Sequence, residues 1–223
     1  MVSGLQYRPP QTRQRPLLEE RRPPGVYIAV EGPIGVGKTT LVRRLAGRLD
    51  AAEVLEVVED NPFLRHFYGD IRGYAFQTQL FFLLSRYRQQ ESIRAWREAG
   101  RSVVSDYLFA KDRLFARMNL EEHELDLYEQ LYALLAPTTV PPDLVIYLTA
   151  SLETLRQRIL QRDRSFERAI PPAYLDRLCQ EYERFFAEVG DTALLRVDTD
   201  QVNIFAEEAL QEIARYAVER TPP

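Results

Sequence analysis

The sequence has little cysteine, little histidine and no long hydrophobic run. Its one cysteine, Cys179, excludes an intramolecular disulfide, and the two histidines are too few to complete a structural zinc cluster with it. Cys179 falls in a helical pattern, so we expect a half-buried structural thiol. No apolar run approaches the roughly 20 residues that cross a bilayer. These absences predict a soluble protein of a reducing, cytoplasmic setting, with no membrane partner.

Lysine is also scarce. The chain has 27 arginines and only two lysines, Lys38 and Lys111. Genomic base composition or adaptation to high temperature explains such a bias. Because lysine is so rare, a lysine inside a motif was not placed there by abundance. The net charge of −4 argues against a broad nucleic-acid surface, so nucleic acid is not an expected partner.

Residues 1–24 differ in composition from the rest of the chain. They are rich in proline and carry five arginines and two glutamates. We expect a flexible N-terminal extension without a packed core. The arginines leave an organelle-targeting segment open, although the prolines and the pair Glu19–Glu20 weaken that interpretation.

Short apolar runs alternate with helical patterns from residue 25 to residue 220. Strands are expected at 26–31, 53–58, 102–105, 144–148 and 194–197. Helices are expected at 38–49, 74–99, 121–135, 152–161, 173–189 and 204–218. This alternation predicts one α/β domain in which helices flank a doubly wound, five-stranded parallel sheet.

The stretch "GPIGVGKT", Gly32 to Thr39, matches the phosphate-binding pattern G-x-x-x-x-G-K-[ST] between an apolar strand and a helix. Its glycines let the backbone N–H groups wrap around phosphates, and Lys38 supplies a charge to the β- and γ-phosphates. The residues expected to bind the triphosphate are Gly32, Pro33, Ile34, Gly35, Val36, Gly37, Lys38, Thr39 and Thr40. The hydroxyl of Thr39 is an expected Mg²⁺ ligand.

Acidic and basic side chains supply the other elements of a phosphoryl-transfer site. Asp106 follows the third expected strand and fits a second Mg²⁺ ligand, although a simple strand-ending or capping aspartate looks the same. Glu59 and Asp60 follow the second expected strand, where a carboxylate can take a proton from an acceptor hydroxyl; a solvated turn is the alternative.

Three arginines cluster farther along the chain. Arg158 and Arg162 lie four residues apart on one helix face, and Arg164 follows just beyond it. Clustered guanidinium groups stabilise the charge of a transferring phosphoryl group. A solvated basic face is the alternative, and it is a serious one in a chain with so many arginines.

Together these segments resemble the deoxynucleoside kinase family from about residue 26 to residue 217, and most closely its bacterial deoxyadenosine and deoxyguanosine kinases. The resemblance implies a P-loop kinase fold with an arginine-rich lid at about 162–169. It also implies an enzyme of nucleotide salvage that moves the γ-phosphate of ATP, with Mg²⁺, to the 5′-hydroxyl of a deoxynucleoside. Members are typically homodimers, and a purine acceptor rests on the overall resemblance alone.

The resemblance also assigns roles to single residues. It makes Glu59 the general base, with Asp60 as a nearby competitor, and it places Arg158, Arg162 and Arg164 on the transferring phosphate. The residues implied for the acceptor are Tyr68 and Glu167 at the sugar 3′-hydroxyl, Gln79 at the base edge, and Arg86 paired with Asp112 beside the base. The chain departs from the family after the third strand, because Tyr107 stands where the family commonly has an arginine. The sequence therefore does not identify which residue neighbours the general base.

Two other functions fit the phosphate-binding loop. A thymidylate kinase shares the loop, the parallel sheet and an arginine-bearing lid, but its acceptor is already a phosphate and needs no base. A nucleotide-dependent switch would normally carry the base-reading motif N-K-x-D, which does not occur here. The preferred base and the donor, ATP or another triphosphate, are also left open by the sequence.

Overall fold

A parallel sheet of five strands organises the computed structural model, which describes residues 25–164, 166–188 and 193–220. The strand order is β2-β3-β1-β4-β5, so the predicted doubly wound parallel sheet is confirmed. The strands are β1 (Tyr27–Glu31), β2 (Ala52–Val54), β3 (Val103–Ser105), β4 (Leu144–Thr149) and β5 (Ala193–Asp198). The predicted N-terminal extension, residues 1–24, lies outside the described residues.

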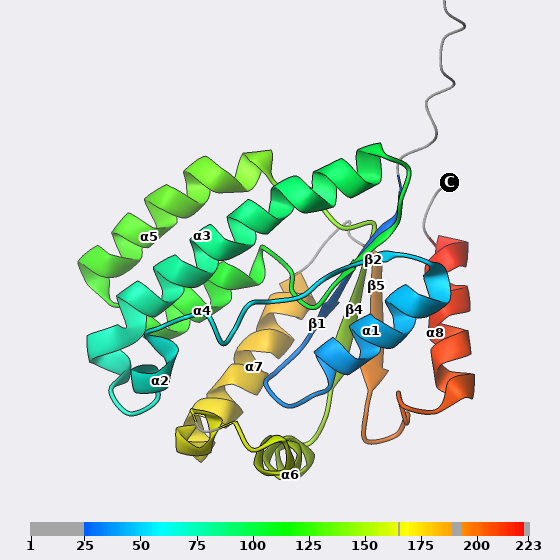
Figure 1. Cartoon of the computed structure of the whole chain (residues 1–223). Helices are drawn as coiled ribbons and strands as arrows, with labels where there is room; N and C mark the ends of the chain where they lie inside the picture. Colours follow the sequence, from blue (N-terminus) through cyan, green and yellow to red (C-terminus); the bar gives the residue numbers. More distant parts are fainter. Residues whose placement is uncertain (1–24, 165, 189–192, 221–223) are drawn as a thin grey trace, which may run out of the picture.

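Helices cover both faces of the sheet (Figure 1). One face carries α1 and α8, which contact each other, and the other carries α3, α4, α5 and α7. The α-helices are α1 (Lys38–Leu49), α2 (Leu64–Phe67), α3 (Ile71–Glu98), α4 (Lys111–Asn119), α5 (Glu122–Leu135), α6 (Leu152–Arg162), α7 (Pro172–Glu188) and α8 (Glu207–Arg220), and two 3₁₀ turns are η1 (Ala136–Thr138) and η2 (Glu167–Ala169). No helix in the described part of the chain is long and apolar enough to cross a membrane.

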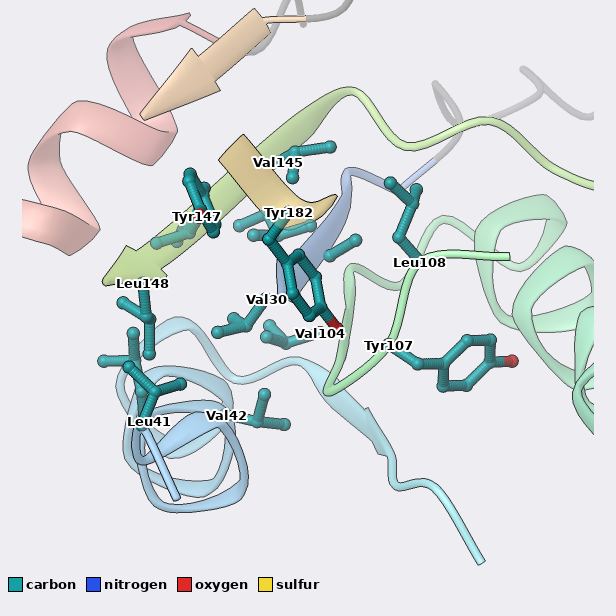
Figure 2. Close-up of a cluster of buried hydrophobic side chains, with 14 of the residues drawn as sticks. Val30, Leu41, Val42, Val104, Tyr107, Leu108, Val145, Tyr147, Leu148 and Tyr182 are labelled. Carbon is teal, nitrogen blue, oxygen red and sulfur yellow. The ribbon is translucent and has the colours of Figure 1, made fainter. Parts of the chain in front are cut away.

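Apolar side chains from the central strands form the core (Figure 2). Val30 and Val145 are buried within the sheet, and Leu41 of α1 packs against one side of it. On the other side Tyr182 of α7 stacks with Tyr147 of β4, with ring centroids 6.1 Å apart. Because both faces of the central strands are covered, these strands read as continuous apolar runs in the sequence.

The second strand is shorter than the sequence predicts. We expected it at 53–58, but β2 ends at Val54, which pairs with Ser105, the last residue of β3. Beyond that point the neighbouring strand offers no further backbone partner. The N–H of Glu56 instead donates to the carboxylate of Asp106, at 2.5 Å. An apolar run that leaves the sheet early cannot be told from a longer strand by periodicity.

The short helices α2 and α4 were not predicted, whereas the longer helices lie within a few residues of their expected bounds. α2 has only four residues. α4 begins at Lys111, five residues after Asp106, in a segment to which we had assigned no element. Its position matters, because it brings Lys111 and Asp112 into the interior of the domain.

A partly buried ion pair closes the amino edge of the sheet. Arg97, near the end of α3, donates to Asp143 at 2.9 Å and to the carbonyl oxygen of Gly25 at 2.7 Å. Asp143 also accepts from the backbone N–H of Tyr27, at 2.7 Å. This cluster fixes the start of β1 at the end of the sheet that lies opposite the carboxyl ends of the strands.

Candidate active site

A pocket of about 780 Å³ lies at the carboxyl ends of the strands, the edge at which open parallel sheets bind ligands. Most of the residues singled out in the sequence line it, although they come from several different elements and loops. Those that line it are Gly32, Ile34, Gly35, Gly37, Lys38, Thr39, Thr40, Glu59, Asp60, Tyr68, Gln79, Arg86, Asp106, Arg158, Arg162, Arg164 and Glu167. Pro33, Val36 and Asp112 do not.

The phosphate-binding loop forms one wall of the pocket. Its lysine, Lys38, donates to the carbonyl oxygens of Gly32 at 2.7 Å and Pro33 at 3.1 Å. Burial, and next the charge of Lys111, lower the pKa of Lys38 to about 8. The loop itself is supported from behind by Arg158, which donates to the carbonyl oxygen of Val36 at 3.3 Å. The two carbonyl oxygens hold the ammonium group of Lys38 at the loop, and a bound phosphate would compete with them for it.

Thr39 and Asp106 form a compact pair of oxygen ligands beside the loop. The Thr39 hydroxyl donates to one carboxylate oxygen of Asp106 at 2.7 Å. Burial and the charge of Glu56 raise the pKa of Asp106. Among the described residues no group of three or more His, Cys, Asp or Glu side chains could hold a metal by itself. A hydroxyl and one carboxylate nevertheless fit Mg²⁺, which keeps several waters and takes further ligands from phosphates.

Of the two glutamates that follow β2, Glu56 rather than Glu59 is the less exposed. β2 ends at Val54, four residues before its expected end at 58, so the chain turns into the pocket earlier than expected. The Glu59 side chain is 69% exposed and contacts Arg164 at 3.3 Å, whereas that of Glu56 is 12% exposed. Glu59 and its competitor Asp60 thus line the rim of the pocket, and Glu56 lies inside it.

Glu56 lies between two cations. One carboxylate oxygen contacts the guanidinium of Arg86, and the other lies 3.7 Å from the ammonium nitrogen of Lys111. Burial alone would raise the pKa of Glu56, but Arg86 and then Lys111 outweigh it and lower that pKa to about 2. The group is therefore a carboxylate at neutral pH.

The inner end of the pocket presents polar side chains from α3. Gln79 and Arg86 are both buried and lie seven residues apart, so they follow each other along one side of the helix. Arg86 contacts Asp112 of α4 and lies over the ring of Phe82, 4.8 Å from its centroid. The implied pairing of Arg86 with Asp112 is thus present, with Asp112 behind Arg86 and outside the pocket lining.

The outer end of the pocket holds the residues after α6. Glu167 is buried and contacts Arg162 through the arginine Nε at 3.0 Å, and Arg164 at 3.6 Å. Tyr68 lines the same region, and burial raises the pKa of its hydroxyl well above the usual value. Two of the three clustered arginines therefore neutralise one carboxylate, while Arg158 supports the loop.

Comparison with known proteins places this geometry in a family. The family model described as deoxynucleoside kinase matches residues 28–220. The chain belongs to the deoxynucleoside kinase family. It is 39% identical over 179 residues to the deoxyguanosine kinase of Bacillus subtilis, a match that covers 78% of this chain and 86% of that relative. It is 31% identical over 198 residues to the deoxyadenosine/deoxycytidine kinase of the same organism, covering 85% of this chain and 90% of the relative.

A solved structure agrees with this membership. The deoxyadenosine kinase from M. mycoides with bound dCTP has a TM-score of 0.76 and 25% sequence identity, and the match covers 87% of this chain and 100% of that one. As a deoxynucleoside kinase, the protein phosphorylates a deoxynucleoside with ATP as the donor. This membership decides against the two alternatives, a thymidylate kinase and a nucleotide-dependent switch.

Besides Arg43, sequence reasoning missed two charged residues of this deoxynucleoside kinase pocket, Glu56 and Lys111. Each carried a signal in the sequence. Glu56 is the only charged residue in the apolar run from Val54 to Val58, and Lys111 is one of two lysines in the chain. Both lysines line the same pocket.

Replacing Gly35 by alanine tests the geometry of the phosphate-binding loop. Gly35 has a φ of 87°, and an added Cβ would lie 2.8 Å from a side-chain carbon of Ile159. We expect the Gly35→Ala protein to lose about 1–3 kcal/mol of unfolding free energy and to gain less thermal stability from ATP. Thermal melts with and without ATP measure both effects.

Gly47→Ala is the matched control. Gly47 lies within α1, and an added Cβ there would meet nothing within 4 Å. Its melting temperature should be equal to or higher than that of the parent, with the full shift on adding ATP. An undiminished ATP shift in Gly35→Ala would contradict the role given to the loop.

Proposed function

We propose that the protein transfers the γ-phosphate of ATP to the 5′-hydroxyl of a purine deoxynucleoside. The observation that carries this proposal is the position of Glu56, a carboxylate only 12% exposed that shares one pocket with the phosphate-binding loop. A neutral hydroxyl needs such a group to orient it and to accept its proton. The activities of the two relatives, deoxyguanosine kinase and deoxyadenosine/deoxycytidine kinase, support a purine acceptor.

The donor occupies the loop in this proposal. Lys38 releases its two carbonyl partners and contacts the β- and γ-phosphates. Thr39 and Asp106 would hold Mg²⁺, which neutralises charge on the phosphates when it is bound. Arg162 and Arg164 lie at the rim, where their guanidinium groups can stabilise the charge that develops on the transferring group. Arg158 holds the loop that presents these phosphates.

The acceptor occupies the inner end. The amide of Gln79 offers a donor and an acceptor together, so it can bond a nucleobase edge in two places. Arg86 fixes that side of the pocket because Glu56 and Asp112 hold its guanidinium. Tyr68 and Glu167 lie at the outer end and fit the sugar 3′-hydroxyl. We therefore propose the base beside α3 and the 5′-hydroxyl at Glu56.

Glu56 takes the role that the sequence analysis gave to Glu59. Its oxygen accepts the hydrogen bond of the 5′-hydroxyl and orients that oxygen toward the γ-phosphorus. The new O–P bond forms as the bond to the β-phosphate oxygen breaks, and the hydroxyl proton passes to Glu56. A carboxylate with a pKa of about 2 is a weak base, so orientation comes first and the proton moves late.

A substrate screen tests the acceptor. We expect the purine deoxynucleosides to be phosphorylated with a higher kcat/KM than deoxycytidine or thymidine, with ATP as the donor. Transfer of ³²P from the γ-position to each of the four deoxynucleosides, and to the matching 5′-monophosphates, gives the result. A preference for a pyrimidine would contradict the purine assignment, and efficient use of a monophosphate would contradict a hydroxyl acceptor altogether.

A pair of conservative variants tests the carboxylate. Glu56→Gln keeps the size of the side chain but cannot accept the proton, so we expect kcat to fall by about 10²- to 10⁴-fold. Glu59→Gln alters an exposed side chain at the rim, and its kcat should stay near that of the parent. Steady-state kinetics of both proteins decide between the two residues. The reverse pattern would restore Glu59 as the base.

We also propose that the protein forms a homodimer through α3 and α5, which lie side by side (Figure 1). Large apolar side chains remain exposed on these helices, including Leu134 at 74%, Leu127 at 53% and Leu84 at 48%. Leu127 and Leu134 lie seven residues apart, on one side of α5. Such an exposed apolar surface is typical of a protein interface.

Sedimentation equilibrium tests this assembly. The parent should sediment as a dimer, and Leu134→Glu should shift it toward the monomer by placing a charge in the apolar contact. Val218→Glu is the matched control, because Val218 is similarly exposed but lies on α8. A monomeric parent, or equal loss of dimer in both variants, would rule out this surface.

A further inference from the structure

Lys111 lies beneath the acceptor end of the pocket, at the first residue of α4. It is 2% exposed, and its ammonium nitrogen is 3.3 Å from a carboxylate oxygen of Glu31 and 3.7 Å from one of Glu56. The ring of Phe115 covers it from the next turn of the helix, with its centroid 5.9 Å away. Lys111 thus bridges two carboxylates, the buried one of Glu31 and the partly exposed one of Glu56.

Three hydrogen bonds, in addition to Lys111, hold the carboxylate of Glu31 in place. It is the last residue of β1 and is fully buried. One oxygen accepts from the backbone N–H of Gly32 at 2.9 Å and from the hydroxyl of Tyr182 at 2.8 Å, and the other accepts from the N–H of Leu108 at 2.8 Å. Figure 2 shows Tyr182 among the core side chains. The carboxylate therefore ties the phosphate-binding loop to the segment that follows β3.

The second carboxylate, Glu56, has no comparable backbone anchor for its side chain among the described residues. It lies on the irregular segment that follows β2, and its oxygens are held by Arg86 and Lys111. A carboxylate on such a segment can rotate toward Lys38, whose positive charge also lowers the pKa of Glu56. Lys111 opposes that rotation because Glu31 fixes it in place.

The use of lysine here is itself informative. Arginine is far more abundant in this chain, yet both lysines line this pocket. An ammonium is a compact point charge, whereas a guanidinium is a broad planar group. A guanidinium, that of Arg86, already occupies one side of Glu56, and a compact cation fits the remaining space between the two carboxylates.

The ring of Tyr107 does not fill this space. Its hydroxyl donates to the carbonyl oxygen of Arg86 at 3.4 Å, and Figure 2 shows the ring directed away from the central strands. Tyr107 therefore packs against α3, and the second cation beside Glu56, after Arg86 of α3, comes from α4. This arrangement answers the question that the sequence left open at Tyr107.

We propose that Lys111 is a positioning residue that holds the Glu56 carboxylate against the acceptor 5′-hydroxyl, and that Glu31 anchors Lys111. The proposal rests on the proposed role of Glu56. Lys111 does not need to touch the substrate, because its effect passes through the carboxylate. Misplacing that carboxylate by about 1 Å is enough to cost on the order of 10²-fold in rate.

A charge-balanced pair of variants tests the proposal. Lys111→Met removes the cation and leaves Glu31 buried without its partner, so we expect loss of stability together with loss of turnover. The double variant Lys111→Met/Glu31→Gln removes both charges, and the amide oxygen of the new side chain still accepts a backbone hydrogen bond. It should regain thermal stability, while kcat stays about 10- to 100-fold below the parent and KM for both substrates changes little. A parental kcat in the double variant would overturn the proposal.

Two further proteins separate this role from a structural one. Arg97→Met breaks a partly buried ion pair at the opposite edge of the sheet, so it should lower stability and leave kcat unchanged. In a Glu56→Gln background, adding Lys111→Met/Glu31→Gln should lower kcat no further, because the positioned group is absent. An equal loss in both backgrounds would show that Lys111 acts independently of Glu56. Parental turnover in Glu56→Gln itself would instead overturn the proposed role of Glu56, and this inference with it.

Discussion

The carboxylate of Asp106 joins the two halves of the pocket. It accepts the hydroxyl of Thr39 with one oxygen, at 2.7 Å, and the backbone N–H of Glu56 with the other, at 2.5 Å. The strand order makes this possible, because β3 lies between β2 and β1 and ends beside both loops. A single side chain therefore sets the separation between the phosphate-binding loop and Glu56, and the proposed in-line transfer requires that separation to be fixed.

Several charged side chains near Glu56 are deeply buried. Glu31, Asp112 and Lys111 are each 2% exposed or less, and Arg86 is 4% exposed. Burying an isolated charge is costly, and pairing offsets that cost only when each group has its partners. Apolar residues of similar volume would stabilise the domain at least as well. A pocket that must meet a charged triphosphate benefits from groups that are already oriented before the substrate binds.

Local patterns accounted for much of the fold and for one wall of the pocket. The phosphate-binding loop and the bounds of α1 follow from a motif whose residues are adjacent in the chain. The alternation of apolar runs and helices gave the parallel sheet, since only a crossover connection, usually a helix, returns the chain to a parallel strand. The resemblance to the family supplied Gln79 and Arg86, which line the pocket, and Asp112, which lies behind Arg86.

Local sequence patterns could not predict residues that act together only through contacts between distant parts of the chain. The sequence by itself was enough to predict a triphosphate site on the glycine-rich loop, because that prediction depends only on neighbouring residues. Only the tertiary structure decided which glutamate lies inside the pocket, because β2 stops where β3 offers no further backbone partner. It also decided the place of Lys111, which meets Glu31 across 80 positions of sequence when α4 packs against the end of β1.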